Sequence, residues 1–276
     1  MHKDLELTFE KVIEILKEDE RCKGGWHYGS VGRGSEDIYS DYDLILLVSD
    51  KDFEKFTTDL AKVIAKASDE LLIFWGEDFN DVHYKNYCSL IRLGDNLHQF
   101  DFFIINADHP EEWMCREHCK GCTNDNIIFD RTGEVAEFLA KGYTTDNYRP
   151  DPIRAMDTYW FHANMLIKYF KREDIFKLIK NIDILFHSHV DLLLSQYDTL
   201  DWGSSESKIK HCIPKEKQQH LKSYFTNADC DDIEATIKKS IILFKKDAEE
   251  VCKAKGIDYP DTIAKQVISF FNRQLS

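Results

Sequence analysis

The sequence predicts an α/β, or α+β, domain with a mixed sheet, followed by an all-α helical bundle domain. Up to about residue 145, short runs rich in aromatic and β-branched residues alternate with helical patterns. Beyond that point, apolar residues recur at helical spacing for most of the remaining chain. Between the two parts, "YTTDNYRPDP" has two prolines and several polar residues, as is typical of a connector. We therefore expect one domain at residues 1–145 and a second at 146–276.

The elements of the first domain follow from the spacing of its apolar residues. An interval of three or four residues between them indicates a helix, and a short aromatic or β-branched run indicates a strand. The expected helices span residues 7–19 and 51–68, and the expected strands span 24–30, 43–49, 70–76, 87–93 and 98–105.

The same argument predicts four helices in the second domain. Two of them lie within residues 156–197 and are joined at "KRED", and two more span residues 231–256 and 261–275. Gly256 is suited to ending the third helix, because a left-handed glycine commonly follows the last helical turn.

Charge and composition narrow the class of protein. The 276 residues include 36 Lys and Arg against 50 Asp and Glu, a formal net charge of −14. This balance argues against a protein that grips nucleic acid, because such binding needs a basic surface, and it suits a cationic small molecule. No apolar run approaches the roughly 20 residues that span a bilayer, and the N-terminus lacks the order of a secretion signal. We expect a cytoplasmic protein without a membrane partner, whose eight cysteines are reduced.

Two aspartates follow a glycine-rich turn in "GSVGRGSEDIYSDYD", residues 29–43. Side chains alternate along an extended chain, so Asp41 and Asp43 should point to one face about 6–7 Å apart. Carboxylates this close repel each other unless a cation lies between them. Oxygen ligands of this kind suit Mg²⁺, which binds proteins through a few carboxylates together with substrate phosphates.

A third aspartate, Asp101, is an isolated charge inside the apolar strand "HQFDFFII". Buried acids are rarely left unpaired, so its position requires a partner. If this strand neighbours the one that carries Asp43, three carboxylates converge. Such a site could hold two magnesium ions about 3.5–4 Å apart, as in phosphoryl and nucleotidyl transfer.

The glycine turn offers the complementary half of a phosphate site. Gly29, Gly32 and Gly34 allow the backbone to approach a ligand closely, and Ser30 with its neighbouring amides can donate to phosphate oxygens. Arg33 adds a positive charge to the same turn. The turn lacks the Gly-Lys-Ser/Thr of a Walker loop and the spacing of the dinucleotide-binding fingerprint.

Together, "YGSVGRGSEDIYSDYDLILLV" and "FDFFII" resemble the Gly-Ser, Asp-x-Asp and third-Asp signature of the DNA polymerase β-like nucleotidyltransferase superfamily. The plan of the whole chain is similar to that of antibiotic nucleotidyltransferases that act on aminoglycosides or lincosamides. The resemblance implies that Gly29 and Ser30 bind the triphosphate of ATP and that Asp41 and Asp43 bind Mg²⁺. It gives Asp101 the role of binding metal or activating the acceptor. The implied reaction moves AMP from ATP to a hydroxyl of a small molecule and releases pyrophosphate, an activity that confers antibiotic resistance.

Other hypotheses stay open from the sequence alone. The acceptor could be a protein side chain, or the chain could bind nucleotides without catalysis, although the presence of all three aspartates weakens the second reading. Polynucleotide synthesis is disfavoured by the charge of −14.

Further candidate residues lie outside the motif. In the helical domain, Lys168 could reach a phosphate, and Glu173 or Asp174 could act as a general base, although "KRED" also suits a solvated joint. The compact run "CREHCKGC" has residue types that zinc favours, but structural zinc sites usually draw on two separated pairs of ligands. Reduced, half-buried thiols are the favoured interpretation of its four candidate ligands, Cys115, His118, Cys119 and Cys122.

Overall fold

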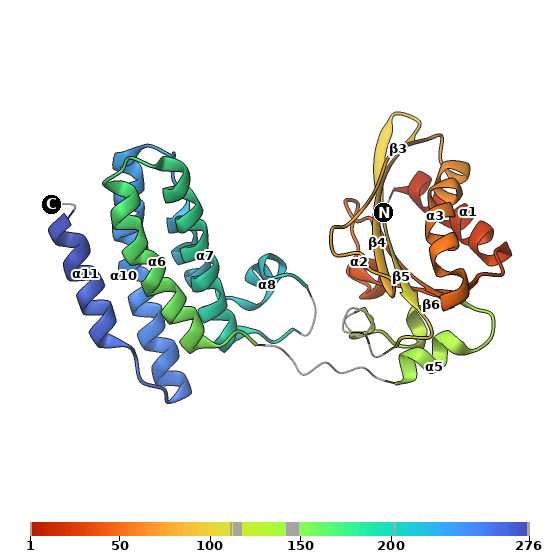
Figure 1. Ribbon diagram of the computed structural model, residues 1–276. Coiled ribbons are helices and arrows are strands. Elements are labelled where there is room, and N and C mark those ends of the chain that lie inside the picture. Colours follow the sequence, from red (N-terminus) through yellow and green to blue (C-terminus); the bar gives the residue numbers. More distant parts are fainter. Residues whose placement is uncertain (1, 111, 113–117, 142–148, 201–202, 275–276) are drawn as a thin grey trace. The chain divides into compact units, whose positions relative to one another are not determined.

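The computed structural model describes residues 2–110, 112, 118–141, 149–200 and 203–274. The chain folds into two compact units, Met1–Asp146 and Asn147–Ser276. The first contains a sheet with flanking helices, and the second is helical (Figure 1). Each unit is described by itself below.

A mixed sheet forms the centre of unit 1, as the sequence predicts, and it has six strands where the sequence predicts five. The strand order is β3-β4-β5-β2-β1-β6, with β2 and β5 parallel and the other neighbouring pairs antiparallel. The strands are β1 (Cys22–His27), β2 (Tyr42–Val48), β3 (Glu70–Gly76), β4 (Tyr84–Leu93), β5 (Asn96–Asn106) and β6 (Ile127–Asp130).

Two helices, α1 (Lys3–Glu18) and α3 (Asp50–Ala67), cover one face of this sheet (Figure 1). Both are amphipathic, and their apolar sides bury Leu44 and Leu46 of β2 in the main core. Side chains alternate along a strand, so the odd-numbered residues of β2 face the opposite side. The face to which Asp43 belongs is therefore not the one that α1 and α3 cover.

The opposite face carries a smaller core towards the carboxyl end of β2. There Ile45 and Leu47 pack with Trp26 and with Phe138 of α5 (Glu134–Ala140). The amino-terminal end of β2 instead adjoins α2 (Gly29–Gly32). The face is thus covered by apolar side chains at one end and bordered by the glycine-rich stretch at the other.

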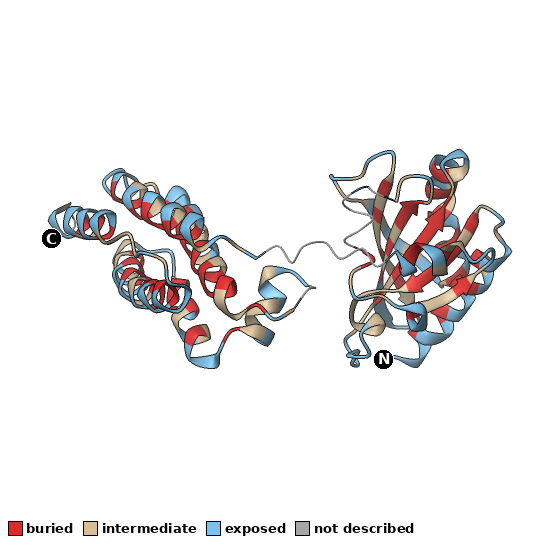
Figure 2. Cartoon of the chain, turned by 90° about the horizontal axis from the view of Figure 1, so that it is seen from below, coloured by how far each residue is buried: buried red, intermediate tan, exposed pale blue. Residues whose placement is uncertain are grey.

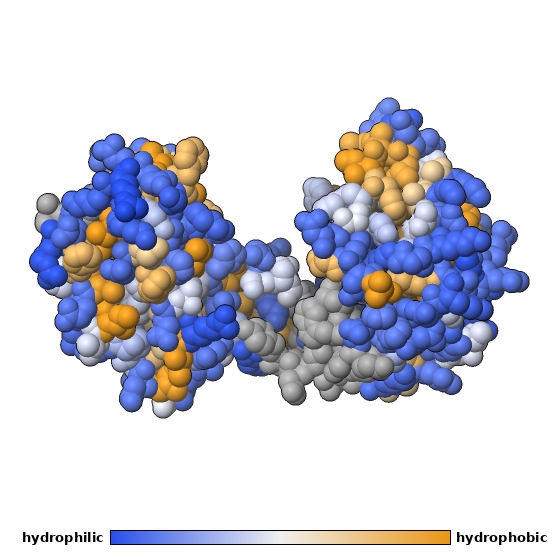
Figure 3. Space-filling model, viewed as in Figure 1, coloured by the Kyte–Doolittle hydropathy of each residue, from blue (hydrophilic) through white to orange (hydrophobic). Residues whose placement is uncertain are grey.

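Exposed apolar side chains gather on the part of unit 1 that the edge strand β3 forms (Figure 3). Leu72, Ile73 and Trp75 are each about half exposed. Isolated exposed apolar residues are common, but a contiguous group on an edge strand is typical of a binding surface.

Unit 2 is an assembly of helices whose inner faces are buried (Figure 2). Glu173 with φ 52° lies in the predicted joint between the first two helices, and Gly256 with φ 66° ends the longest helix as predicted. The α-helices are α6 (Pro152–Phe170), α7 (Ile175–Tyr197), α8 (Ser205–Cys212), α9 (Lys215–Leu221), α10 (Cys230–Lys255) and α11 (Asp261–Gln274).

Several short elements escape prediction from sequence. The stretch that begins at Gly29, expected to be a simple turn, is the one-turn helix α2, and β6, α5, α8 and α9 were not expected at all. Elements of four to eight residues are too short to show a full hydrophobic period, and their contacts with the rest of the fold decide their conformation.

Candidate active site

Asp43 and Asp101 are direct partners in the parallel pairing of β2 with β5. Paired residues of neighbouring strands project from the same face, with backbones about 4.8 Å apart. Asp41 precedes Asp43 by two positions, so it belongs to the same side of the chain. The structure thus brings the three predicted aspartates to one end of one sheet face.

The charges of the three aspartates influence one another. Burial, followed by the charges of Asp41 and Asp101, raises the pKa of Asp43 to about 7. Burial also raises the pKa of Asp101, and Asp41 adds to that rise. Arg33, at the end of α2, acts in the opposite direction on Asp43. Ionising both Asp43 and Asp101 is therefore unfavourable unless a cation compensates their charge.

The three aspartates do not form a closed cage. Among the residues that the structure describes, their oxygens are not a group that lies within 4.8 Å of one another. Mg²⁺ does not need such a cage, because it keeps several water ligands and takes others from substrate phosphates. Carboxylate oxygens of Asp43 and Asp101 on adjacent strands, with Asp41 just before β2, are a donor set that fits this ion.

Gly29 lies directly against the Asp43 carboxylate. Its φ is +57°, and a Cβ at this position would be 1.6 Å from Oδ2 of Asp43. The neighbouring amide of Tyr28 donates to the carbonyl of Asp43 at 3.0 Å. No residue other than glycine fits here without moving the aspartate, so the turn and the carboxylates form one structure.

The rest of the turn is anchored from a distant segment. Asn126 donates its side-chain amide to the Gly32 carbonyl at 2.6 Å. Ser30 is half buried, and its carbonyl accepts from the amide of Ser35 at 3.0 Å. These bonds fix the backbone around Ser30 before any ligand arrives.

Gly29→Ala is expected to lower kcat/KM for the nucleotidyl transfer that the sequence predicts by about 100-fold or more, because displacing a group that acts in catalysis by about 1 Å costs that much. Gly94→Ala is the matched control, since Gly94 also has a positive φ of +58° but nothing lies within 4 Å of an added Cβ. Steady-state kinetics of the two variants distinguish the clash with Asp43, which only Gly29→Ala introduces, from the cost of alanine at a positive φ, which both variants share. Equal losses in both variants would contradict the assignment.

Asp41, Asp43 and Asp101 are called the aspartate row below, and sequence reasoning missed the residues that extend it. Cys88 pairs with Asp101, and Trp75 pairs with Cys88, so the row continues across β4 to the edge strand β3. Glu77 contributes to the raised pKa of Asp101, and Gln99 donates to both oxygens of that aspartate at 3.1 Å. The acid-rich run "WGED", which contains Trp75 and Glu77, was the one weak signal of these residues in the sequence. The pairing of β3 with β4 that brings them into the row cannot be predicted from the sequence.

Three other candidates belong to unit 2. Lys168 is exposed on α6, with its ammonium 5.0 Å from the ring centre of Tyr169. Asp174 caps α7 by accepting from the amide of Lys177 at 3.2 Å, and it forms an ion pair with the same lysine. These contacts place Asp174 in the joint between the helices, as expected if "KRED" is a solvated joint. Glu173, the preceding residue, is exposed.

The residues of "CREHCKGC" that the structure describes lie in the smaller core. Nε2 of His118 is 3.1 Å from the Tyr84 hydroxyl, and the His118 carbonyl accepts from the thiol of Cys122. Burial raises the pKa of Cys122 to about 11, so it stays a thiol. Cys119 is buried and Cys115 lies outside the described residues. Within residues 118–122, these contacts favour core packing over metal binding.

No helix in the described part of the chain is long and apolar enough to cross a membrane.

No curated protein matches the sequence. Among solved structures, the chain is similar to an aminoglycoside 6-adenyltransferase from Bacillus subtilis, with 12% identity over 100% of this chain and 99% of that one, at a TM-score of 0.46. The family model for streptomycin adenylyltransferase matches residues 2–274. Because that match spans almost the whole sequence, the chain belongs to the streptomycin adenylyltransferase family of enzymes.

Proposed function

We propose that this adenylyltransferase moves AMP from ATP to a hydroxyl of an aminoglycoside and releases pyrophosphate. The observation that carries the proposal is the pairing of Asp43 with Asp101, with Gly29 packed against Asp43. Family membership supports adenylyl transfer, and the family's description supports an aminoglycoside as acceptor. The formal charge of −14 suits such a polycation.

Mg²⁺ would be held by Asp41, Asp43 and Asp101. When bound, it would neutralise the triphosphate and the charge that develops on the leaving pyrophosphate. The raised pKa values of Asp43 and Asp101 support this assignment, because both carboxylates gain by pairing with a cation. The backbone of Gly29 and Ser30, with the charge of Arg33, would position the phosphates. Lys168 remains a candidate for a further phosphate contact.

The chemical step needs little beyond alignment and proton transfer. The acceptor oxygen forms a bond to the α-phosphorus of ATP, and the bond from that phosphorus to the pyrophosphate oxygen breaks. The hydroxyl proton passes to the carboxylate of Asp101, whose two oxygens Gln99 holds in place. Pyrophosphate leaves with the electron pair of the broken bond.

The acceptor would lie on the same sheet face, beyond Asp101. Trp75 continues the aspartate row there and is 51% exposed. An aromatic face with Glu77 close by offers stacking and charge to an amino sugar.

Trp75→Ala is expected to raise the KM for the acceptor by about 2- to 30-fold, the equivalent of a contact between a cation and an aromatic ring. The KM for ATP should stay unchanged, because the phosphates lie at the other end of the row. Phe79→Ala is the control, since Phe79 is also 51% exposed but lies outside the row. A larger effect on ATP than on the acceptor would count against this placement.

The proposed function is tested with a panel of acceptors and ATP labelled in its α-phosphate. Aminoglycosides, lincosamides and cellular proteins are each incubated with the enzyme and Mg²⁺, and transferred label is measured. We expect label on an aminoglycoside. Label on a protein would support the protein-acceptor alternative, and bound ATP without transfer to any acceptor would support a binding module.

A further inference from the structure

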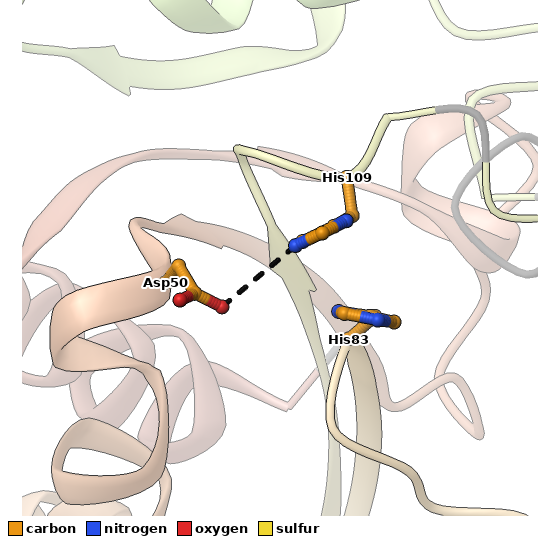
Figure 4. Close-up of side chains that lie close together, drawn as sticks. All are labelled: Asp50, His83 and His109. Atoms are coloured by element: carbon orange, nitrogen blue, oxygen red, sulfur yellow. Dashed lines mark ion pairs between the residues drawn. The ribbon is translucent and has the colours of Figure 1, made fainter.

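A second group of metal-ligating side chains lies at the far end of the same strands (Figure 4). Asp50 begins α3 just after β2, His83 precedes β4, and His109 follows β5. One potential ligand atom of each lies within 4.8 Å of the other two, and among the described residues no other three such side chains approach one another as closely. Asp43 and Asp101 lie five residues before the ends of β2 and β5, a distance of about 16 Å at about 3.3 Å per residue. The group is therefore separate from the aspartate row.

One buried residue, Asn106, connects the three segments. Its side chain is fully buried, and its amide donates to Oδ1 of Asp50 at 2.8 Å. Its backbone amide donates to the carbonyl of His83 at 2.9 Å, and its carbonyl accepts from the amide of His109 at 3.2 Å. The backbone that carries each side chain is thus fixed relative to the other two, as ligands of a metal site are supported by hydrogen bonds around them.

Asp50 and His109 lie close to each other but do not form a hydrogen bond. Nε2 of His109 is 3.9 Å from Oδ1 of Asp50, too far for a hydrogen bond. The rings of His83 and His109 have their centres 3.8 Å apart. Nδ1 of His83 is buried and has no hydrogen-bond partner among the described residues. Buried polar atoms normally have a partner, so this ring lacks one that an ion would supply.

We propose that Asp50, His83 and His109 form a zinc site. Two imidazoles and one carboxylate are a set that zinc accepts with water as a fourth ligand, whereas Mg²⁺ prefers oxygen alone. Ligand atoms in a tetrahedral zinc site are about 3.4 Å apart for bonds of about 2.0–2.1 Å. The side chains must move to reach that separation, and those of Asp50 and His109 have room to do so because they are 63% and 40% exposed.

Zinc at this position would fasten three segments to one another. They are the start of α3, the loop before β4 and the segment after β5, which lie far apart in the sequence. An ion that binds only the folded state stabilises it by mass action. The site would therefore act on the stability of unit 1 and not on the adenylyl transfer step.

The test is a zinc titration of protein freed of metal with a chelator. Zn²⁺ is added in competition with a chromophoric chelator, with excess Mg²⁺ present to occupy the aspartate row. We expect the wild-type protein to bind one equivalent. His83→Gln and His109→Gln should each weaken that binding by about 100-fold or more, because even the outer partners of ligands contribute about 10- to 100-fold.

His187→Gln is the matched control. His187 lies 3.4 Å from Asp183 and 4.0 Å from Glu206, but in the described part of the chain these side chains do not form a group as close as that of Asp50, His83 and His109. The thiols are the same in all four proteins, so a difference between them reports this site. Circular dichroism first shows that the variants fold, and Zn²⁺ should then raise the Tm of the wild type and His187→Gln alone. Absence of zinc binding by the wild type, wild-type affinity in either site variant, or equal weakening in His187→Gln would overturn the proposal.

Discussion

Asp43→Asn is expected to lower the rate of adenylyl transfer by about 10³-fold or more, a loss typical of removing a group that stabilises transition-state charge. Asparagine keeps the shape of the side chain but cannot compensate a cation. The Asp43 carboxylate lies against Gly29, and Asp43 is the strand partner of Asp101. The measurement is pyrophosphate release with ATP, Mg²⁺ and an aminoglycoside. Asp95→Asn, in the exposed hairpin between β4 and β5, is the control.

The thermal stability of Asp43→Asn distinguishes a catalytic role of Asp43 from a structural one. Its pKa is raised from 3.8 to about 7, so the folded state holds this proton more tightly than the unfolded state. Without metal, the carboxylate therefore lowers the stability of unit 1 as the pH rises through that range. Asp43→Asn should melt at or above the wild-type Tm near pH 8 while its activity is lost. A lower Tm together with lost activity would instead indicate misfolding, and unchanged activity would contradict the site.

Asp247→Ala is expected to destabilise unit 2 by about 3–5 kcal/mol, the typical cost of removing one partner from a buried ion pair. Asp247 is fully buried on α10. It accepts hydrogen bonds from Nε2 of His189, Nζ of Lys217 and Nδ1 of His220, at 3.0, 2.7 and 2.7 Å. Without the carboxylate, the ammonium of Lys217 keeps only Glu250 as a partner among the ion pairs that the structure describes.

Chemical denaturation monitored by circular dichroism measures this loss. Glu249→Ala is the control, because Glu249 lies two residues away on the same helix but is 52% exposed and pairs with Lys245 at 3.6 Å. An exposed pair of this kind contributes about 0–1 kcal/mol. A loss in Asp247→Ala no larger than that in Glu249→Ala would contradict the structural role of the network.

The same network makes the stability of unit 2 depend on pH. Burial lowers the pKa of His189 from 6.5, so this ring stays neutral in the folded state. Burial alone would raise the pKa of Asp247, but the hydrogen bonds from His189, Lys217 and His220 outweigh it and hold the value at about 2. Both folded pKa values are depressed, so stability is lost as the pH falls, first below 6.5 through His189 and then between 3.8 and about 2 through Asp247. A midpoint of denaturation that does not change between about pH 8 and pH 5 would contradict the role of His189.

The parts of the aspartate row that depend only on the alternation of side chains along a strand could be predicted from the sequence. Asp41 and Asp43 share a face because they are two positions apart, and Asp101 stands out as a charge in an apolar strand. Their meeting also depended on β2 lying next to β5, which the spacing of residues within each strand does not decide. Trp75 and Cys88 could not be placed, because the register of antiparallel strands is set by contacts distant in sequence.

The remaining features depend on tertiary structure for the same reason. His189 and Asp247 are 58 residues apart in the sequence, and no motif around either residue indicates that the two form a hydrogen bond. Asp50, His83 and His109 come together only once β2, β4 and β5 are aligned. Lys168 shows a further limit, since a lysine on a helix surface looks the same whether or not it serves a ligand.

The most direct test of the central claim is the mass of the acceptor after the reaction. An aminoglycoside is incubated with the wild-type enzyme, ATP and Mg²⁺, and the product is analysed by mass spectrometry. The aspartate row and the glycine turn predict an acceptor heavier by one adenylyl group, with one pyrophosphate released for each group transferred. An aminoglycoside of unchanged mass under conditions in which the enzyme binds or consumes ATP would contradict the claim.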